Sequence, residues 1–143
     1  MMNRQKTVAQ LGFVGGLLLA FTSLGIGIYQ TMVLLHLLNN GKRAHGVVID
    51  IDVGVKGGRK AVFQFTTESG QLVTSRDVFQ MILIRHRKGD TVTVLYDPSN
   101  VKAATVDMGL WTWQEPGALY FGFVFLLGLT LFLRRWELKD LRN

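Results

Sequence analysis

The sequence predicts a membrane α+β protein, in which two transmembrane helices flank a small antiparallel β domain that forms a barrel or a strongly twisted sheet. Three observations lead to this fold class. Residues 8–38 contain no charged side chain, and residues 117–133 form a second uncharged run. Between them, residues 44–107 contain short runs with the two-residue alternation of half-buried strands. Charged residues make up 18% of the 143-residue chain, below the roughly 25% that is typical of soluble domains.

The first apolar run is longer than a membrane span needs. As a helix, residues 8–28 already reach about 31 Å, which crosses the roughly 30 Å hydrocarbon core. We therefore expect residues 8–38 to form one unbroken helix, whose last two turns leave the membrane and pack on the β domain. Leu34, Leu35 and Leu38 would otherwise expose their apolar area to water. A cleaved signal peptide is the alternative, but its apolar region spans only about 7–15 residues.

Five runs in the middle segment have the composition of strands, because they are rich in Val, Thr and Phe and are separated by Gly and Asp turns. They cover residues 45–53, 60–67, 71–76, 91–96 and 101–107. Alternation within the first two runs predicts two apolar faces. These faces are Val47, Ile49, Ile51 and Val53 in the first run, and Ala61, Phe63 and Phe65 in the second. Closure into a barrel would remove the exposed edges of so small a sheet.

The second apolar run, residues 117–133, is at the lower length limit for a span. Its flanks nevertheless identify it as one. Glu115 and Pro116 suit the N-cap and the first position of a helix. Aromatic and basic side chains of the kind that anchor spans at the membrane surface lie on both sides of the run. They are Trp111, Trp113, Arg134, Arg135 and Trp136.

Basic residues near the two spans predict the topology. Residues 1–7 carry Arg and Lys without an acid, and residues 134–143 carry four basic side chains. Because cytoplasmic flanks are enriched in Lys and Arg, we expect both tails to be cytoplasmic and the β domain to be extracytoplasmic. Membrane anchors and scattered surface residues then account for most of the net charge of +6. This explanation weakens the case for a nucleic-acid partner.

The middle segment resembles a known family. Its first strand, the run AVFQFTTESGQLV and the run GDTVTVLYDPSNVKAATVD look like the bacterial domain-of-unknown-function 3592 (DUF3592) family over residues 44–107. The most specific residues are Gly89, Asp90, Val92, Val94, Tyr96, Asp97 and Pro98. The sequence departs from the family at Val101, where a proline is common. The resemblance implies a multi-pass bacterial inner-membrane protein with a β domain between two helices, and it brings no catalytic residue.

No residues in the sequence have the spacing of a known catalytic or metal site, so we expect no catalytic residues, no metal and no cofactor. Asp50 and Asp52 share one face of a strand, for which a solvated surface is the simpler interpretation. A basic loop is a candidate contact for lipid headgroups or for an acidic partner, with a hydrated loop as the simpler alternative. This basic loop comprises Arg85, His86, Arg87 and Lys88.

Small residues recur in both apolar runs, where they allow membrane helices to approach each other closely. They serve either the packing of the two spans or contact with a partner's helix, and the sequence does not distinguish these roles. The candidate positions are Gly12, Gly16, Gly25, Ala118, Gly122 and Gly128.

These observations favour a non-enzymatic inner-membrane protein that binds another membrane protein as an accessory or assembly subunit, with membrane lipids around it. Pairing of two copies stays open. The family resemblance adds the alternative of an immunity protein against a toxin that acts from the periplasm or on the membrane. The third alternative is a membrane enzyme that acts on lipid or cell-wall substrates through Asp50, Asp52 and His45.

Overall fold

The computed structural model describes residues 2–54, 57–83 and 85–140, and among these it places the side chains except those of residues 2–7, 9, 137, 138 and 140. The chain forms two compact units. The helix unit consists of Met1–Tyr29 and Pro116–Asn143, and the β unit consists of Gln30–Glu115.

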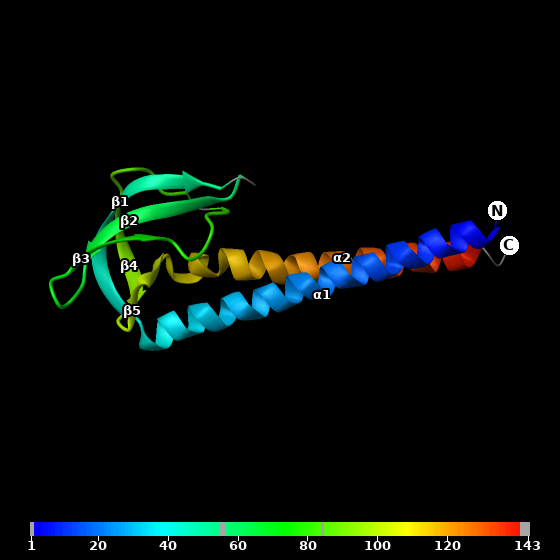
Figure 1. Ribbon diagram of the computed structural model, residues 1–143, viewed down its shortest axis with the longest axis horizontal. Coiled ribbons are helices and arrows are strands. Elements are labelled where there is room, and N and C mark those ends of the chain that lie inside the picture. Colours follow the sequence, from blue (N-terminus) through cyan, green and yellow to red (C-terminus); the bar gives the residue numbers. More distant parts are fainter. Residues whose placement is uncertain (1, 55–56, 84, 141–143) are drawn as a thin grey trace. The chain divides into compact units, whose positions relative to one another are not determined.

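Along the chain, five strands lie between two long helices (Figure 1). The elements are α1 (Met2–Asn40), β1 (Lys42–Val53), β2 (Arg59–Thr66), β3 (Leu72–Arg76), β4 (Thr91–Asp97), β5 (Asn100–Val106), the 3-10 helix η1 (Gly109–Trp113) and α2 (Gln114–Asp140). Both predicted helices and all five predicted strands are therefore confirmed, whereas η1 was not predicted. Residues 2–7 and 134–140, expected as tails, continue the two helices.

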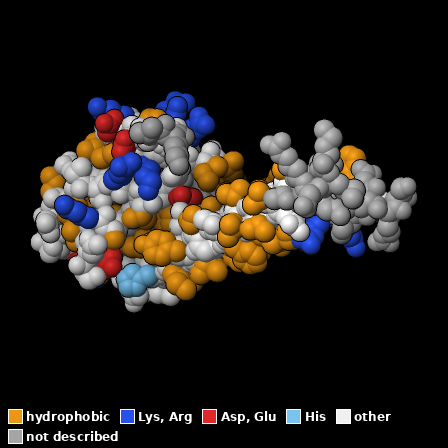
Figure 2. All heavy atoms as spheres, turned by 45° about the vertical axis from the view of Figure 1, so that its right-hand side comes forward, with side chains coloured by type: hydrophobic (Ala, Val, Ile, Leu, Met, Phe, Trp, Pro, Cys, Tyr) orange, Lys and Arg blue, Asp and Glu red, His pale blue; other side chains and the backbone are white. Residues whose placement is uncertain are grey.

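Both helices are long and apolar enough to cross a membrane, over Gln10–Asn40 and Gly109–Trp136. Hydrophobic side chains cover much of the described surface of the helix unit (Figure 2). Helix α1 continues to Asn40, two residues beyond the expected end, where Gly41 N donates a hydrogen bond of 2.8 Å to Leu37 O and the chain then enters β1.

The five strands form one antiparallel sheet in the order β3-β2-β1-β4-β5. The sheet curls until its two edge strands approach each other. Ser75 Oγ at the β3 edge donates a hydrogen bond of 2.7 Å to Lys102 O of β5. Just beyond β3, Val78 N donates one of 3.1 Å to Ala104 O. The predicted barrel-like domain is thus a nearly closed five-stranded barrel.

Strand β1 serves two neighbours, because its first half pairs with β4 and its second half pairs with β2. Gly46 lies where the two pairings overlap, opposite both Phe65 and Val92. A Cβ atom added to Gly46 would lie 2.8 Å from Val94 Cγ2 and 3.0 Å from Gln64 O. Only glycine fits this crossing without displacing the neighbouring strands.

A β-bulge in β1 corrects the face predicted for this strand. The register shifts between Val48 and Asp50, because one strand has a residue more than its partner there. Before the bulge, Val48 is fully buried and Val47 is exposed, opposite to the prediction. After the bulge, Ile51 packs against the core as predicted, although Val53 at the end of the strand is exposed. Strict alternation cannot locate a bulge, so it assigned the first half of the strand to the wrong side.

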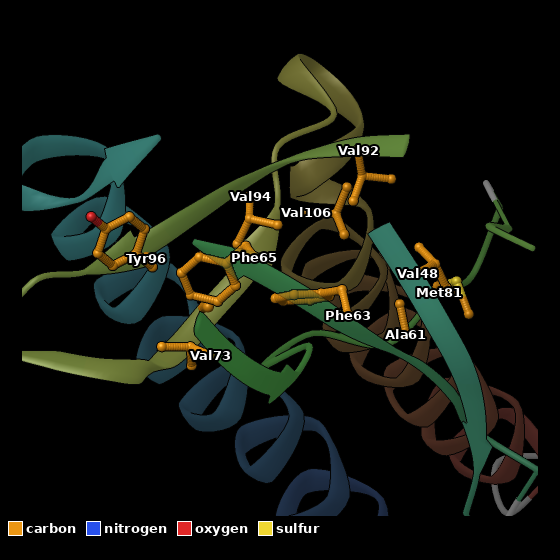
Figure 3. Packing of buried hydrophobic residues seen from close by; sticks show 11 residues of the cluster. Val48, Ala61, Phe63, Phe65, Val73, Met81, Val92, Val94, Tyr96 and Val106 are labelled. Carbon is orange, nitrogen blue, oxygen red and sulfur yellow. The ribbon is translucent and has the colours of Figure 1, made fainter. Parts of the chain in front are cut away.

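Aromatic side chains fill the centre of the barrel (Figure 3). The ring centroids of Phe63 and Phe65 lie 6.0 Å apart, and those of Phe65 and Tyr96 lie 5.1 Å apart. Ala61 is fully buried beside them. The apolar face predicted for the second strand is therefore confirmed. The remaining core residues are Val48, Val73, Met81, Val92, Val94, Ala104 and Val106.

The last turns of α1 belong to the β unit, as predicted, but they bury a different face. Leu34 and Leu37 are 0% and 1% exposed, whereas Leu35 is 43% exposed and Leu38 is 37% exposed. Helical neighbours lie three or four residues apart, so Leu34 pairs with Leu37 as readily as with Leu38. Of the three leucines expected to pack on the β domain, Leu34 is therefore buried as predicted, whereas Leu35 and Leu38 are exposed and Leu37 takes their place.

Candidate functional site

The three residues considered for catalysis lie at exposed or half-exposed positions of β1, and the two aspartates among them have local partners. Asp50 Oδ1 accepts a hydrogen bond of 2.9 Å from Ile51 N. Asp52 Oδ2 lies 2.8 Å from Arg76 Nη2 in an ion pair. His45 is exposed and lies opposite Thr93 of β4. Within the described parts of the chain, no three His, Asp or Glu side chains are grouped so that they could hold a metal ion.

The Tyr96-Asp97 pair joins three parts of the β unit. The buried Tyr96 hydroxyl accepts a hydrogen bond of 3.2 Å from Glu68 N, in the turn between β2 and β3. Asp97 Oδ1 accepts hydrogen bonds from Ser99 N at 2.8 Å and from Ser99 Oγ at 2.6 Å. Its Oδ2 lies 3.0 Å from His36 Nε2 on α1. The two residues thus connect the β2–β3 turn and the β4–β5 turn to the end of α1, which is an architectural role.

Hydrogen bonds explain the acidity of Asp97. Those from the side chain and backbone of Ser99 lower the pKa of Asp97 to about 2, and His36 contributes less. The carboxylate is therefore ionised at every physiological pH and accepts its hydrogen bonds as a charged group.

The beginning of α2 holds the segment between β3 and β4. Gln114 Oε1 accepts hydrogen bonds from Ile82 N at 3.0 Å and from Leu83 N at 2.7 Å. Glu115 Oε2 accepts one of 2.5 Å from Gln80 N, and its Oε1 accepts one of 2.9 Å from Gln30 Nε2. Glu115 was expected to cap α2. Instead it lies in the first turn and satisfies backbone and side-chain donors of the β unit.

Sequence reasoning missed Asp77, which follows β3 and is only 4% exposed. Its Oδ1 accepts hydrogen bonds from Phe79 N at 3.0 Å and from Thr105 Oγ1 at 2.7 Å, and its Oδ2 accepts one of 3.2 Å from Val106 N. Burial raises the pKa of Asp77 to about 6 against the opposing effect of these bonds. An Asp directly after a strand favours a turn of this kind, but nothing in the sequence indicates its burial.

The basic loop lies against the segment that precedes α2. Arg85, Arg87 and Lys88 are exposed, whereas His86 is half-buried. His86 Nε2 lies 3.2 Å from Met108 Sδ, and burial lowers the pKa of this histidine. The loop is closed by a hydrogen bond of 2.7 Å from Arg87 N to Asp90 Oδ2. The cations of the predicted cluster therefore face solvent, while its histidine faces the protein.

Large apolar side chains are exposed beside the basic loop. Leu110 and Trp111 of η1 are 89% and 51% exposed, and Leu83 is 68% exposed. Leu83 lies close to η1, because its N–H is bonded to Gln114 at the first residue of α2. The β unit thus combines exposed apolar and cationic groups in the region where its chain continues into α2.

Small side chains line the seam between the two helices of the helix unit. Ala20 is fully buried, and Ser23 Oγ donates a hydrogen bond of 2.8 Å to Leu119 O. Gly16 lies directly against Thr130, and a Cβ atom added to Gly122 would lie 3.4 Å from Ser23 Oγ. Two of the six predicted packing residues, Gly16 and Gly122, therefore lie at the helix–helix contact.

The other four predicted packing residues lie elsewhere. A Cβ atom added to Gly12, Gly25 or Gly128 would meet no described atom within 4 Å, and Ala118 is exposed. Their packing against the opposite helix is not observed.

One side of α2 carries an exposed stripe, which we call the outer stripe. Its members follow the alternating three- and four-residue spacing of one helix face. They are Ala118, Phe121, Phe125, Gly128 and Phe132. Phe123 packs on Phe21 of α1 and Thr130 on Gly16. Phe121 and Gly128 each lie two residues from these contacts, which is about 200° around the helix. The outer stripe therefore faces away from α1.

Of the comparisons with known proteins, one gives a match, and this match lies in the β unit. The family model described as "Domain of unknown function (DUF3592)" matches residues 44–111. No curated protein and no solved structure matches the chain significantly. The match begins within β1 and ends in η1, so it covers the barrel.

Proposed function

We propose that the protein is a non-enzymatic accessory protein of the bacterial inner membrane, in which residues 44–111 form a DUF3592 domain. It crosses the membrane twice with both termini in the cytoplasm, holds the barrel on the extracytoplasmic side and binds another membrane protein. The length and apolar composition of α1 and α2 support the two crossings.

The outer stripe of α2 is the observation that carries the proposed binding. Phe121, Phe125 and Phe132 are 74%, 59% and 63% exposed, and Gly128 lies among them with open space around its Cα. Lipid accepts any apolar side chain, but a small residue between large ones forms a hole into which a partner's side chain fits. The stripe therefore has the alternation of large and small side chains that allows two helices to pack closely in a membrane.

The end of α1 supports the same proposal. Leu34 and Leu37 are buried within the β unit, and His36 contacts Asp97 of that unit. These contacts lie within the β unit, so the last turns of α1 are part of the folded domain rather than a loose linker. A folded segment at the entry to the domain reduces the conformational entropy that is lost when a partner binds there.

Photo-crosslinking in living cells tests the proposed binding. The photoreactive amino acid p-benzoylphenylalanine replaces Phe125 on the outer stripe or, as a control, Phe123 at the contact with Phe21. We expect Phe125→benzoylphenylalanine to give an adduct with one defined membrane protein, and the Phe123 variant to react within its own chain. Adducts of the Phe125 variant with lipid alone, or with a second copy of this chain, would contradict the proposal.

A glycine pair then tests the role of the hole. Gly128→Leu fills the outer stripe, and Gly15→Leu adds the same bulk to α1, where a Cβ also meets no described atom within 4 Å. We expect only Gly128→Leu to reduce the Phe125 adduct, by at least ten-fold. Equal reduction by both variants would indicate a general loss of insertion rather than a specific interface.

Thiol labelling tests the topology separately, because the chain has no cysteine and every introduced thiol is unique. Val53→Cys places a thiol at an exposed end of β1, and Lys139→Cys places one near the end of α2. In spheroplasts, an impermeant maleimide should label Val53→Cys and leave Lys139→Cys unreacted. The reverse pattern would place the barrel in the cytoplasm.

A further inference from the structure

A surface of the β unit combines three exposed apolar side chains with three exposed cations. We call it the headgroup surface. Its members are Leu83, Leu110, Trp111, Arg85, Arg87 and Lys88. The six residues come from two segments that are far apart in the sequence, so their association depends on the fold.

Two contacts, one on each side of Arg85, hold these segments together. On one side, Leu83 N donates a hydrogen bond of 2.7 Å to Gln114 Oε1. On the other side, His86 Nε2 lies 3.2 Å from Met108 Sδ. Both partners belong to residues 108–114, which contain η1 and the first residue of α2. Arg85 is therefore held close to the point where the apolar helix begins.

The cations of the headgroup surface are free to bind an external anion. In the β unit, Lys42 pairs with Glu68, Arg43 with Asp107 at 2.7 Å, and Arg76 with Asp52 at 2.8 Å. Within the described residues, Arg85, Arg87 and Lys88 have no such carboxylate partner. Asp90 is the acid of this loop, and it accepts the backbone N–H of Arg87. One nearby carboxylate leaves the loop with a net positive charge.

The apolar members suit one environment in particular. Trp is enriched where a protein crosses the membrane–water boundary, since its ring is apolar and its N–H is polar. Leu110 is 89% exposed, and its side chain would lose contact with water if it lay among the acyl chains just below the headgroups. Apolar groups beside cations at the start of a span are the pattern of a surface that contacts anionic lipid.

From this arrangement we propose that the headgroup surface binds anionic phospholipid at the membrane face where α2 begins. Leu83, Leu110 and Trp111 enter the interfacial layer, and Arg85, Arg87 and Lys88 bind the lipid phosphates. The inference goes beyond binding of a protein partner and rests on the part of the proposed function that places α2 in the membrane. It makes the barrel sensitive to the lipid composition of the leaflet beneath it.

The experiment measures which lipids surround Leu110. The full chain with Leu110→Cys carries a single bimane fluorophore, since the natural chain has no cysteine. It is reconstituted in nanodiscs of three parts phosphatidylcholine to one part phosphatidylglycerol. Trace amounts of nitroxide-labelled phosphatidylglycerol or phosphatidylcholine are then added to separate samples. The ratio of quenching by the two labelled lipids gives the local enrichment of the anionic lipid.

We expect labelled phosphatidylglycerol to quench several-fold more strongly than labelled phosphatidylcholine, since one basic side chain near an anionic surface contributes about a five-fold preference. Arg85→Gln combined with Arg87→Gln should lower this ratio several-fold, with Lys88 left as the one remaining cation of the surface. The matched control, Arg76→Gln with Lys102→Gln, removes the same charge from residues without a contact to residues 108–114 and should keep the ratio. Circular dichroism verifies that both double variants remain folded.

Three results would overturn the inference. Equal quenching by both lipids in the parent protein would show that the surface has no anionic preference. Equal loss in both double variants would show that net charge alone acts. Loss of the preference on adding millimolar inorganic phosphate, but not chloride of the same ionic strength, would identify a site for free phosphate instead. Co-elution of the labelled chain with the nanodisc verifies that the chain is inserted. Because no partner protein is present in the nanodisc, a failure of partner binding cannot be confused with these outcomes.

Discussion

The helix unit and the β unit pack with opposite kinds of side chain. At the contact between α1 and α2 lie Gly16, Ala20 and Ser23, and the large aromatic rings Phe121 and Phe125 point outward. In the barrel the large rings Phe63 and Phe65 are buried, and they alternate with the less buried Val62, Gln64 and Thr66. Apart from the contact of Phe123 with Phe21, the large rings of α2 named here are thus exposed, whereas those of the barrel are buried.

The proposed location of the two helices in lipid accounts for this difference. In water, burial of apolar area drives packing, at about 25 cal/mol per Å², so the largest apolar groups are placed inside. Between helices in lipid this drive is absent, and close backbone approach through small residues provides the van der Waals contact instead. The reversed pattern is what two helices in lipid and a barrel in water require, and four substitution experiments test it.

The largest effect is expected from Phe63→Ala in the barrel. Phe63 is fully buried, so its removal leaves a cavity and should lower the free energy of unfolding by about 3–5 kcal/mol. Phe121→Ala is the control, because this equally large ring is 74% exposed on α2 and should change stability little. Chemical unfolding in mild detergent, followed by near-ultraviolet circular dichroism, measures both. Similar losses in the two variants would show that the units do not differ as described.

Leu37→Asp should have the next largest effect. The side chain is 1% exposed, so an unpaired carboxylate there would either be buried or force the last turns of α1 away from the barrel. We expect a loss of about 2–4 kcal/mol and faster proteolysis near Asn40. Leu35→Asp, two residues earlier and 43% exposed, should be close to neutral. A larger effect from Leu35→Asp would restore the face predicted from the sequence.

The pH dependence of stability should depend on Asp77. Burial raises its pKa from 3.8 to about 6, so between these values the folded protein keeps a proton that the unfolded chain has lost. The contribution of Asp77 to the free energy of unfolding is therefore full below about pH 4 and falls as the pH rises to 6. Two pKa units correspond to about 3 kcal/mol.

Asp77→Asn removes this titration. The stability of Asp77→Asn relative to wild type should rise by up to about 3 kcal/mol between pH 4 and pH 7. Unfolding curves of the two proteins, recorded at each pH, measure the difference in the free energy of unfolding. Asp97 and Asp107, whose pKa values are lowered, have the opposite effect on stability, but they are present in both proteins and cancel in this difference. Parallel pH profiles for the two proteins would contradict the assignment.

The smallest effect is expected in the helix unit, from Gly16→Leu. The new side chain would collide with Thr130, and overpacking of this kind costs about 1–3 kcal/mol. Gly25→Leu adds the same bulk where no described atom lies within 4 Å and should have no effect on the hairpin. A disulfide between Ser23→Cys and Gly122→Cys reports the helix contact, because a Cβ at residue 122 would lie 3.4 Å from Ser23 Oγ. Equal crosslinking in both backgrounds would place the contact elsewhere.

The elements of this fold could be predicted from the sequence, because hydrophobic run length and two-residue alternation are local signals. The two helices and all five strands are found where those signals lie. What failed was the choice of face: Val48 instead of Val47, and Leu37 instead of Leu35. The position of a bulge and the buried face of a helix depend on the other segment of the chain that packs against them. That segment cannot be recognised from the local sequence.

The headgroup surface and Asp77 show the same limit for the candidate site. The basic loop was recognised as a cluster of charge, but its proximity to Trp111 depends on the contact of Leu83 with Gln114. Nothing in the sequence relates these residues, which are separated by two strands. Burial of Asp77 depends likewise on Thr105 and Val106 of β5, so it appears only when the barrel is closed.

The double pairing of β1 also determines how the barrel can assemble. Its second half meets β2 across a short turn, whereas its first half must wait for β4, with Gly46 opposite Val92. Loop closure becomes costlier with separation along the chain, so we expect β1, β2 and β3 to form a meander first. Until residues 91–97 have been synthesised, Lys42–Val47 is an open strand edge able to pair with another chain. The half of β1 that follows α1 is thus the part of the nascent protein most exposed to misassociation.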